Sequence, residues 1–369
     1  FSNNCVNALA CDLGNGILYA GTDAGVYQYD GSTWEEAGGE TSKFTVLSLS
    51  YDASQGVIYA GTHHHGVWAY AGFSWYDTGG GISDFSVTSL VWDPFQELLY
   101  AVAWVGFDYS CGVYQYNGAG WQVAGEDLSR YGPYSLAYDP EHRLLYAGTI
   151  GQGVWKYDGI SWEDTGNLIY GRSVLSLLYE LDHHVLYAGT SAGVFRYDGS
   201  NWQNTGGAVS GTWVHSLAYD FERQLLYAGT DAGVYQYDGS TWQNTGGAVS
   251  GRTVMTLVFD HEHGLLYAGT SGYGVWRYDG STWQDTGGAL SGCQVDSLAY
   301  SSSGNLLYAG THDRGTWSLW YPSYKISCSI VPEVSGTVTG TGTYDHGSPV
   351  THTVTPNPGY RFLGWKEGG

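Results

Sequence analysis

The sequence is poor in positive charge. It has 13 Lys and Arg residues against 35 Asp and Glu residues, which gives a formal net charge of −22. Proteins that bind nucleic acid or anionic membrane surfaces need basic patches, so this balance argues against both partners. No apolar run reaches the roughly 18 residues that a membrane-spanning helix needs, and we expect no membrane insertion.

The signatures of common enzyme classes are also missing. The sequence contains no Gly-x-Ser-x-Gly, Walker loop, His-Glu-x-x-His or Cys-x-x-Cys. We therefore expect a non-enzymatic protein without a cofactor, although the acidic composition leaves calcium binding open.

What the sequence has is a repeat. The string Leu-Tyr-Ala-Gly-Thr, or a close variant, occurs eight times at spacings of 40 to 46 residues, with its tyrosine at Tyr19, Tyr59, Tyr100, Tyr146, Tyr187, Tyr227, Tyr267 and Tyr308. A period in this range is typical of a repeat architecture. Residues present in every unit are then expected to serve the scaffold.

One repeat reads as four short strands. From Val214 to Gly251, four runs of β-branched, aromatic and aliphatic residues are bounded by Gly, Asp, Asn or Ser, with a hairpin signal at Asp238–Gly239. No window shows the apolar period of a helix. The strands are apolar or small on both faces, as in a sheet packed between two neighbours. We predict an all-β protein: an eight-bladed β-propeller of four-stranded antiparallel blades.

The two ends of this ring do not match. The first unit starts directly at its innermost strand, near Val6, and the eighth lacks the Asp-Gly-Ser-Thr-Trp segment of its fourth strand. Tyr324–Ile330 is one candidate for a replacement strand, and residues preceding Phe1 are the other. Composition changes after Pro322, so we expect a propeller over 1–321 and a separate β module over 322–369.

Two of the five cysteines fall at this seam. Alignment of the first and last units places Cys5 and Cys293 one residue apart in equivalent positions. If the ring closes, a Cys5–Cys293 disulfide could join its ends, provided that the two Cα atoms lie within about 7 Å.

The C-terminal residues resemble a known module. Gly336-Thr-Val-Thr-Gly-Thr-Gly-Thr and Gly359-Tyr-Arg-Phe-Leu-Gly-Trp365 are similar to the internalin-type B-repeat, a small β module of large bacterial surface and secreted proteins. The resemblance implies a partial module cut from a longer extracellular polypeptide. Because the chain begins with Phe1 and not Met, we also expect a removed signal peptide or a fragment, and an exported, cell-surface location.

The propeller units have relatives as well. Tyr-Asp-Gly-Ser-Thr-Trp resembles the Asp-box turn of sialidases and sortilin-like receptors, and Leu-Tyr-Ala-Gly-Thr-x-x-Gly-Val-Tyr resembles the sensor propellers of bacterial two-component regulators. Both resemblances concern scaffold turns, so they imply a fold and not an activity.

Residues that the repeat does not require are the candidates for binding. The third unit carries the one insertion, in which Trp104, Phe107 and Tyr109 are surplus aromatics, and Trp213 is private to the loop before the sixth unit. We expect a ligand site there, unless the insertion folds down and plugs the central channel. His63 and His65 are weak candidates for metal ligands, because at most two residues of a consecutive histidine run readily reach one ion.

These observations favour an extracellular recognition or adhesion module that binds a glycan or a surface protein. Two alternatives remain open. The chain could be a structural domain of a surface layer or filament, with self-association in a larger assembly. It could also be a polysaccharide-acting hydrolase or lyase that uses a carboxylate pair not singled out by the repeat.

Overall fold

A computed structural model shows two compact units, Phe1–Leu319 and Trp320–Gly369, which are described separately. The structure describes residues 5–364 except for short gaps at 13–16, 30–33, 38–40, 42, 73, 106–109, 126–127, 287–289, 302–305, 313–315, 321–322, 327–328, 341 and 346–350. No helix within these described residues is long and apolar enough to cross a membrane.

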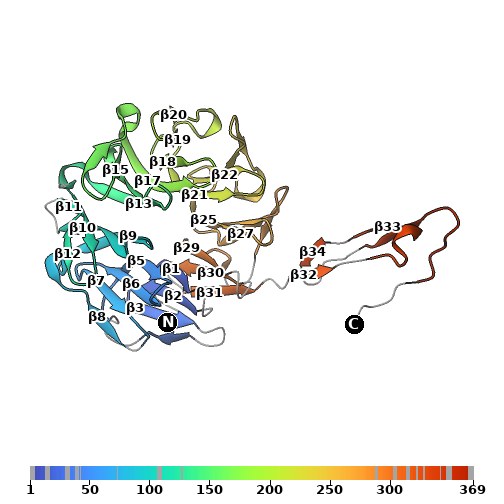
Figure 1. The fold of residues 1–369 in the computed structure, drawn as a ribbon, viewed down its shortest axis with the longest axis horizontal. Helices are drawn as coiled ribbons and strands as arrows, with labels where there is room; N and C mark the ends of the chain where they lie inside the picture. The colour runs from blue at the N-terminus through green and yellow to red at the C-terminus, as the bar shows by residue number, and fades with distance from the viewer. Residues whose placement is uncertain are drawn as a thin grey trace. The chain divides into compact units, whose positions relative to one another are not determined.

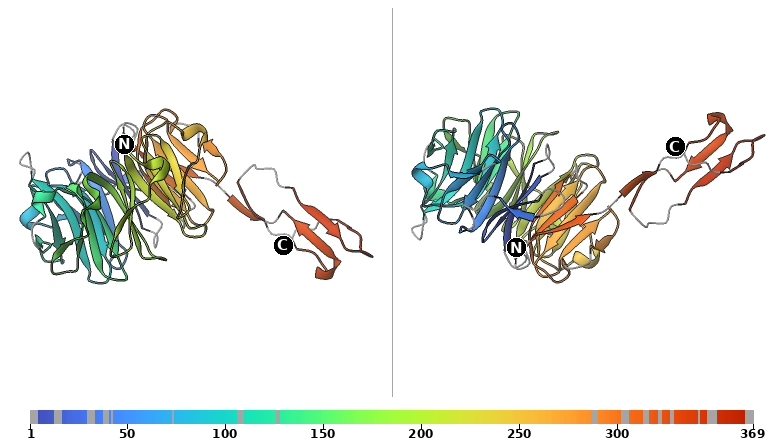
Figure 2. Two further views of the ribbon diagram at one scale, coloured as in Figure 1. Left: turned by 90° about the horizontal axis from the view of Figure 1, so that it is seen from above. Right: turned by 90° about the horizontal axis from the view of Figure 1, so that it is seen from below.

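The first unit is an eight-bladed β-propeller, which confirms the predicted fold class. The blades follow one another round the ring in chain order, and each sheet runs from an inner to an outer strand (Figure 1). Seen edge-on, they stand side by side, face to face (Figure 2).

Blades 1 to 4 consist of β1 (Val6–Asp12), β2 (Ile17–Thr22), β3 (Gly25–Tyr29) and β4 (Trp34–Glu36); β5 (Val46–Asp52), β6 (Val57–Thr62), β7 (Val67–Tyr70) and β8 (Trp75–Asp77); β9 (Ser86–Asp93), β10 (Leu98–Val105), β11 (Ser110–Tyr116) and β12 (Trp121–Val123); and β13 (Pro133–Asp139), β14 (Leu144–Gln152), β15 (Val154–Tyr157) and β16 (Trp162–Asp164). Blades 5 to 8 consist of β17 (Tyr170–Glu180), β18 (Val185–Thr190), β19 (Gly193–Tyr197) and β20 (Trp202–Asn204); β21 (Val214–Asp220), β22 (Leu225–Thr230), β23 (Gly233–Tyr237) and β24 (Trp242–Asn244); β25 (Val254–Asp260), β26 (Leu265–Thr270), β27 (Val275–Tyr278) and β28 (Trp283–Asp285); and β29 (Val295–Ser301), β30 (Leu306–Thr311) and β31 (Thr316–Trp320).

Short 3-10 turns precede several of the inner strands, among them η1 (Gly80–Ile82), η2 (Ser129–Tyr131), η3 (Asn167–Ile169), η4 (Gly207–Val209) and η5 (Gly247–Val249). These turns and the loops between second and third strands lie at one end of the ring, called the loop face below. The turns between first and second and between third and fourth strands lie at the other end, called the turn face.

The repeated glycine explains how closely neighbouring blades pack. A methyl group on Gly229 of β22 would lie 2.8 Å from Val254 Cγ1 in the next inner strand, and the same overlap would arise between Gly189 and Val214. Only a residue without Cβ lets β21–β24 and β25–β28 approach this far. The Leu-Tyr-Ala-Gly-Thr string is therefore an interblade packing signal.

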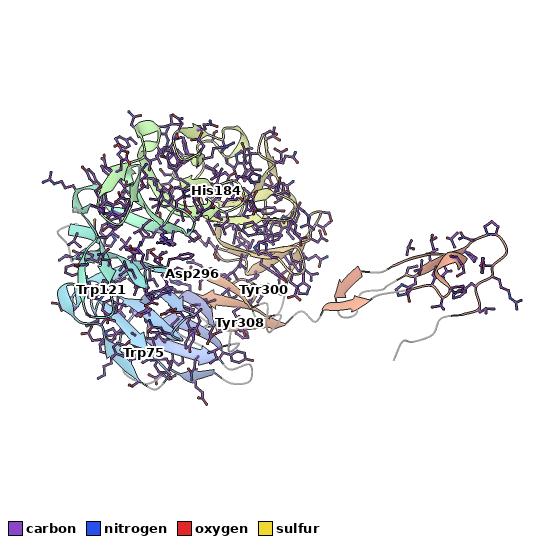
Figure 3. The ribbon with its side chains drawn as sticks, in the orientation of Figure 1. Trp75, Trp121, His184, Asp296, Tyr300 and Tyr308 are labelled. Carbon is purple, nitrogen blue, oxygen red and sulfur yellow. The ribbon has the colours of Figure 1, made fainter. Side chains whose placement is uncertain are left out.

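The repeated tryptophan joins blades at their outer edge. Trp242 stacks on Tyr237 of its own blade and donates its indole N–H to Thr205 Oγ1 of the preceding blade at 2.9 Å. Trp121 repeats this with Thr78 at 2.8 Å. Figure 3 places Trp75 and Trp121 toward the outside of the ring and Asp296 near its centre.

Among the described residues the ring closes without a shared strand. In that part of the chain, blade 8 consists of β29, β30 and β31. A methyl group on Gly310 would lie 2.5 Å from Val6 Cγ1, and the Tyr29 and Tyr308 rings meet edge-on at 6.0 Å, so blades 8 and 1 pack as the other pairs do.

The proposed replacement strand does not complete this blade. β32 (Ser323–Ile326), at the start of Tyr324–Ile330, pairs with β34 (Gly342–Asp345) inside the second unit. That unit also contains η7 (Glu333–Ser335) and the pair β33 (Gly336–Thr339) with β35 (Thr353–Pro356). Of the two candidates for a replacement strand, Tyr324–Ile330 therefore uses the backbone hydrogen bonds of its described residues Tyr324–Ile326 within the second unit.

Candidate functional site

Trp213 is the most prominent private side chain on the loop face. It lies between η4 and β21, and 50% of its surface is exposed. Its loop is fixed by backbone hydrogen bonds, since Trp213 O accepts from Asp231 N at 3.2 Å and Gly211 N donates to Ala232 O at 3.1 Å. An exposed aromatic ring on an ordered backbone loses little entropy when it binds a ligand.

The eight inner strands carry unlike residues at one position near their loop-face ends. Each inner strand has a β-bulge near its start: its pairing with the second strand of the same blade skips one residue. The skipped residue always follows the first valine of the strand, or the proline that replaces this valine in blade 4. The bulged residues are Asn7, Leu47, Thr88, Tyr134, Leu175, His215, Met255 and Asp296. We call these eight residues the mouth ring.

The mouth ring was missed in the sequence analysis, although a signal was available. Val and Ser recur on either side of this position, while the position itself is not conserved between the units. Bulges aim a side chain away from the regular pleat. A position that varies inside a constant repeat is therefore a candidate for recognition.

The mouth ring is apolar and aromatic over blades 4 to 7. Tyr134 is 42% exposed, Leu175 and Met255 are half-buried, and the His215 ring lies 6.5 Å from that of Trp213. Burial lowers the pKa of His215, and the Asp231 carboxylate opposes this shift. A lowered pKa favours the neutral imidazole, which can both donate and accept a hydrogen bond.

The same sector of the loop face carries further exposed side chains. β14 and β17 extend beyond their blades and pair with each other, Ile150 with Ser173 and Gln152 with Tyr170. Ile150 and Tyr170 are exposed on this extension. We call Tyr134, Ile150, Tyr170, Trp213 and Tyr273 the exposed apolar arc, since all five lie at the loop-face end of blades 4 to 7.

Two arginines of this sector, Arg252 and Arg172, lie against aromatic rings. Arg252 is placed over Tyr273 at 4.2 Å and over Trp276 at 4.9 Å, and Arg172 over Phe195 at 5.0 Å. These cation–π contacts hold the planar guanidinium groups against the rings, and Arg172 Nη1 also donates to Leu168 O at 2.8 Å.

The insertion of blade 3 is only partly described. Trp104 lies in β10, pairs with Cys111 of β11 and packs beside Leu128 in the core shared with blade 4. Its indole N–H is buried and has no hydrogen-bond partner among the described residues. Phe107 and Tyr109 lie outside the described residues. Trp104 thus packs between blades, and its role in binding stays a prediction.

The histidine run of blade 2 does not form a metal centre with other described residues. The His65 ring is tilted against that of Phe44 with ring centroids 4.3 Å apart, and the His63 and His64 rings meet at 3.9 Å. Burial and the two neighbouring histidines lower the pKa of His63. Neither His63 nor His65 belongs to the group of three converging donor side chains found among the described residues.

The predicted Cys5–Cys293 disulfide is not formed in the structure. Cys293 is buried between blades 7 and 8, where its carbonyl accepts from Gly274 N at 2.9 Å. Cys5 lies between blades 8 and 1, and its Sγ is 3.5 Å from His312 Nδ1. Equivalent positions in consecutive units lie at consecutive interfaces, so a whole blade separates them.

The carboxylates at the ends of the inner strands cap turns. Each accepts backbone N–H groups from the second and third following residues and is at most 1% exposed: Asp52, Asp93, Asp139, Glu180, Asp220 and Asp260. The hairpin aspartates behave alike, as Asp238 does with Ser240 and Thr241. These bonds agree with the expectation that residues present in every unit serve the scaffold.

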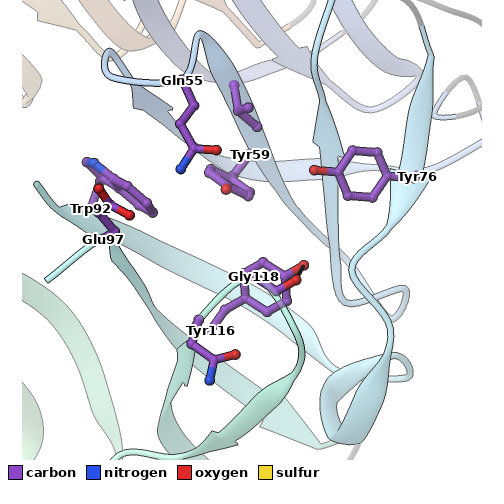
Figure 4. Close-up of a pocket in the computed structure, with 9 residues that line it drawn as sticks. Gln55, Tyr59, Tyr76, Trp92, Glu97, Tyr116 and Gly118 are labelled. Atoms are coloured by element: carbon purple, nitrogen blue, oxygen red, sulfur yellow. Dashed lines mark hydrogen bonds between the residues drawn. The ribbon is translucent and has the colours of Figure 1, made fainter.

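The turn face has small grooves between blades. Figure 4 shows one of about 230 Å³ between blades 2 and 3, where Tyr59, Tyr76, Trp92 and Tyr116 surround an opening edged by Glu97. A similar groove of about 280 Å³ lies between blades 5 and 6. Because the same position is hollow at two interfaces, we attribute these grooves to blade packing.

The comparisons with known proteins find different relatives for the propeller and for the C-terminal unit. Residues 326–369 match the divergent InlB B-repeat domain family. This confirms the resemblance of the C-terminal unit to the internalin-type B-repeat. No curated protein matches the chain.

The propeller is similar to solved structures at low identity. The extracellular domain of BT4673 from B. thetaiotaomicron is 21% identical, with a TM-score of 0.57 over 83% of this chain and 43% of that one. PorZ, a surface component of the type-IX secretion system of Porphyromonas gingivalis, is 15% identical, with a TM-score of 0.56 over 92% of this chain and 59% of that one. The xyloglucanase of Xanthomonas campestris is 14% identical, with a TM-score of 0.58 over 86% and 59%. This chain therefore spans about half the length of these neighbours, and the likeness shows the fold alone.

Proposed function

We propose that the chain is an extracellular, non-enzymatic recognition and adhesion module, and that its propeller binds a glycan on the loop face. The B-repeat match at residues 326–369 and the surface or extracellular neighbours support an exported location. The exposed apolar arc supports the choice of face.

The observation that carries the proposal is Trp213. Packing does not require it, half of its surface is exposed, and its loop is held by hydrogen bonds. A flat indole face can cover the apolar face of a sugar ring, while His215 and the backbone groups beside it supply polar contacts.

Charge narrows the class of glycan. The net charge of −22 repels acidic polysaccharides over the range of the Debye length, so a neutral glycan is expected. The sector offers both components that a neutral sugar needs, namely aromatic faces and fixed donors such as those of Arg252.

A glycan array tests the proposal. The chain should bind neutral oligosaccharides, and Trp213→Ala should lose that binding. Tyr76→Ala is the matched control, since Tyr76 is 45% exposed but lies at the turn face. No glycan signal combined with binding to surface proteins would move the assignment to a protein receptor. Concentration-dependent self-association in light scattering, with no ligand, would favour a structural domain.

A further inference from the structure

Three side chains with metal-binding atoms meet where the ring closes. Cys5 comes from the start of blade 1, and Asp296 and His312 come from blade 8. His312 Nδ1 lies 3.5 Å from Cys5 Sγ and 3.2 Å from Asp296 Oδ2. All three donor atoms lie within 4.8 Å of one another. We propose that they bind a Zn²⁺ ion that links the two ends of the propeller.

The distances fit a tetrahedral ion. Zn–S bonds of about 2.3 Å and Zn–N or Zn–O bonds of about 2.0–2.2 Å, at tetrahedral angles, place sulfur and nitrogen roughly 3.6 Å apart and nitrogen and oxygen roughly 3.4 Å apart. The observed separations of 3.5 and 3.2 Å are close to these edges. Thiolate, imidazole and carboxylate together suit zinc better than the hard cations calcium or magnesium.

The arrangement does not suit a proton relay. In a Cys-His-Asp catalytic group, the two ring nitrogens of histidine face different partners. Here Cys5 Sγ and Asp296 Oδ2 both approach Nδ1 of His312. A sulfur and a carboxylate oxygen beside the same ring nitrogen can all bind one metal ion, whereas a proton relay needs one of them at each ring nitrogen.

Neighbouring groups hold each ligand in place. Gln294 Nε2 donates to Asp296 Oδ1 at 2.8 Å, which leaves Oδ2 directed at the cluster. Gln294 O accepts from His312 N at 3.0 Å. Cys5 N donates to Asp23 Oδ1 at 3.1 Å, and Cys5 O accepts from Asp23 N. Such outer contacts orient ligands and are part of most zinc sites.

The site is open to solvent on one side. The His312 side chain is 61% exposed and that of Asp296 is 18% exposed. Asp296 belongs to the mouth ring, so an ion can enter from the loop face. Three protein ligands leave one position of a tetrahedron for water.

An ion at the contact between blades 8 and 1 would stabilise the closed ring. Blades 8 and 1 share no strand within the part of the chain that the structure describes, and no disulfide joins Cys5 to Cys293. An ion held by Cys5 on one side and by Asp296 and His312 on the other would tie the ends of the ring, and its binding energy would count toward folding.

The equivalent positions of another interface provide a control. Between blades 2 and 3 they are His63, Leu47 and Ser86, which supply one metal ligand in place of three. Of these two contacts between blades, only the one between blades 8 and 1 has three metal ligands. His63→Ala should therefore leave zinc binding unchanged.

Cobalt substitution tests the site directly. Protein purified without a histidine tag and freed of metal with a chelator is titrated with Co²⁺, then with Zn²⁺. We expect one ion per chain, a thiolate-to-cobalt charge-transfer absorption, and its displacement by Zn²⁺. Cys5→Ser should abolish that absorption and weaken Zn²⁺ binding at least tenfold, while His63→Ala matches the parent.

Stability supplies a second readout. Zn²⁺ should raise the melting temperature of the parent and of His63→Ala but not of Cys5→Ser. If Cys5→Ser fails to fold, Gln294→Ala keeps all three ligands and should weaken Zn²⁺ binding by about 10- to 100-fold. A charge-transfer band that persists in Cys5→Ser, or no band in the parent, would overturn the proposal.

Discussion

Adding one methyl group at Gly229 tests the packing that spaces the blades. The new carbon would lie 2.8 Å from Val254 Cγ1 and 3.2 Å from Leu257 Cγ, against about 3.5–4.0 Å for a normal carbon–carbon contact. Overpacking of this kind costs about 1–3 kcal/mol, and the loss of glycine's freedom in the unfolded chain returns about 0.4–1 kcal/mol. We expect Gly229→Ala to lower the free energy of unfolding by about 1–2 kcal/mol.

A double-mutant cycle isolates the contact. Val254→Ala alone removes buried methyl groups and should cost about 1–3 kcal/mol. In the double variant the closest overlap, with Val254 Cγ1, disappears, and the new methyl group refills part of the space, so the cost should fall short of the sum by at least about 1 kcal/mol. Urea unfolding followed by tryptophan fluorescence measures all three.

Gly120 is the matched control. A methyl group there would meet no heavy atom within 4 Å, so Gly120→Ala should change the free energy of unfolding by less than about 0.5 kcal/mol. Additive energies in the cycle, or equal effects of Gly229→Ala and Gly120→Ala, would refute the reasoning. The natural sequence contains one such paired change. Val102 of blade 3 stands at the repeated glycine position, and Pro133 of the next inner strand stands at the position of the facing valine.

Three further outcomes are expected. Thr205→Val removes the acceptor of the Trp242 indole N–H and should destabilise the fold by about 1–3 kcal/mol in urea; no change would mean that water replaces the hydroxyl. Burial and the Asp220 carboxylate raise the pKa of Tyr227 to about 12, so its stabilising contribution is complete below pH 10 and is lost as pH rises from 10 to 12. Tyrosinate absorbance should then rise together with unfolding, and ionisation well before unfolding would contradict the assignment. A chain ending after Trp320 should melt at the temperature of the full chain, because β32 pairs with β34 and not with blade 8; a large drop would show that the second unit completes the ring.

Periodicity made the scaffold predictable. Trp242, Gly229 and Asp238 recur in nearly every unit, so the repeat alone predicts that each serves the scaffold. The strand count of a blade and the order of strands follow from the same repetition.

The candidate sites were harder to predict because they depend on neighbours in space. Cys5 and His312 are 307 residues apart, and only ring closure brings them together. The disulfide prediction failed for the same reason, since equivalent positions in adjacent units are separated by the width of a blade. The direction of the mouth-ring side chains could not be predicted from the repeat pattern, because a β-bulge changes it and the sequence carries no clear signal for that bulge.

The most direct test of the proposed function is the affinity of the chain for its best neutral oligosaccharide from the array, measured by calorimetry for the parent, Trp213→Ala and Tyr76→Ala. Removing a central aromatic contact typically costs at least about 2 kcal/mol, which is roughly 30-fold in affinity. We predict that loss for Trp213→Ala and an unchanged affinity for Tyr76→Ala. Equal affinities for all three proteins, or a loss confined to Tyr76→Ala, would contradict a glycan site on the loop face.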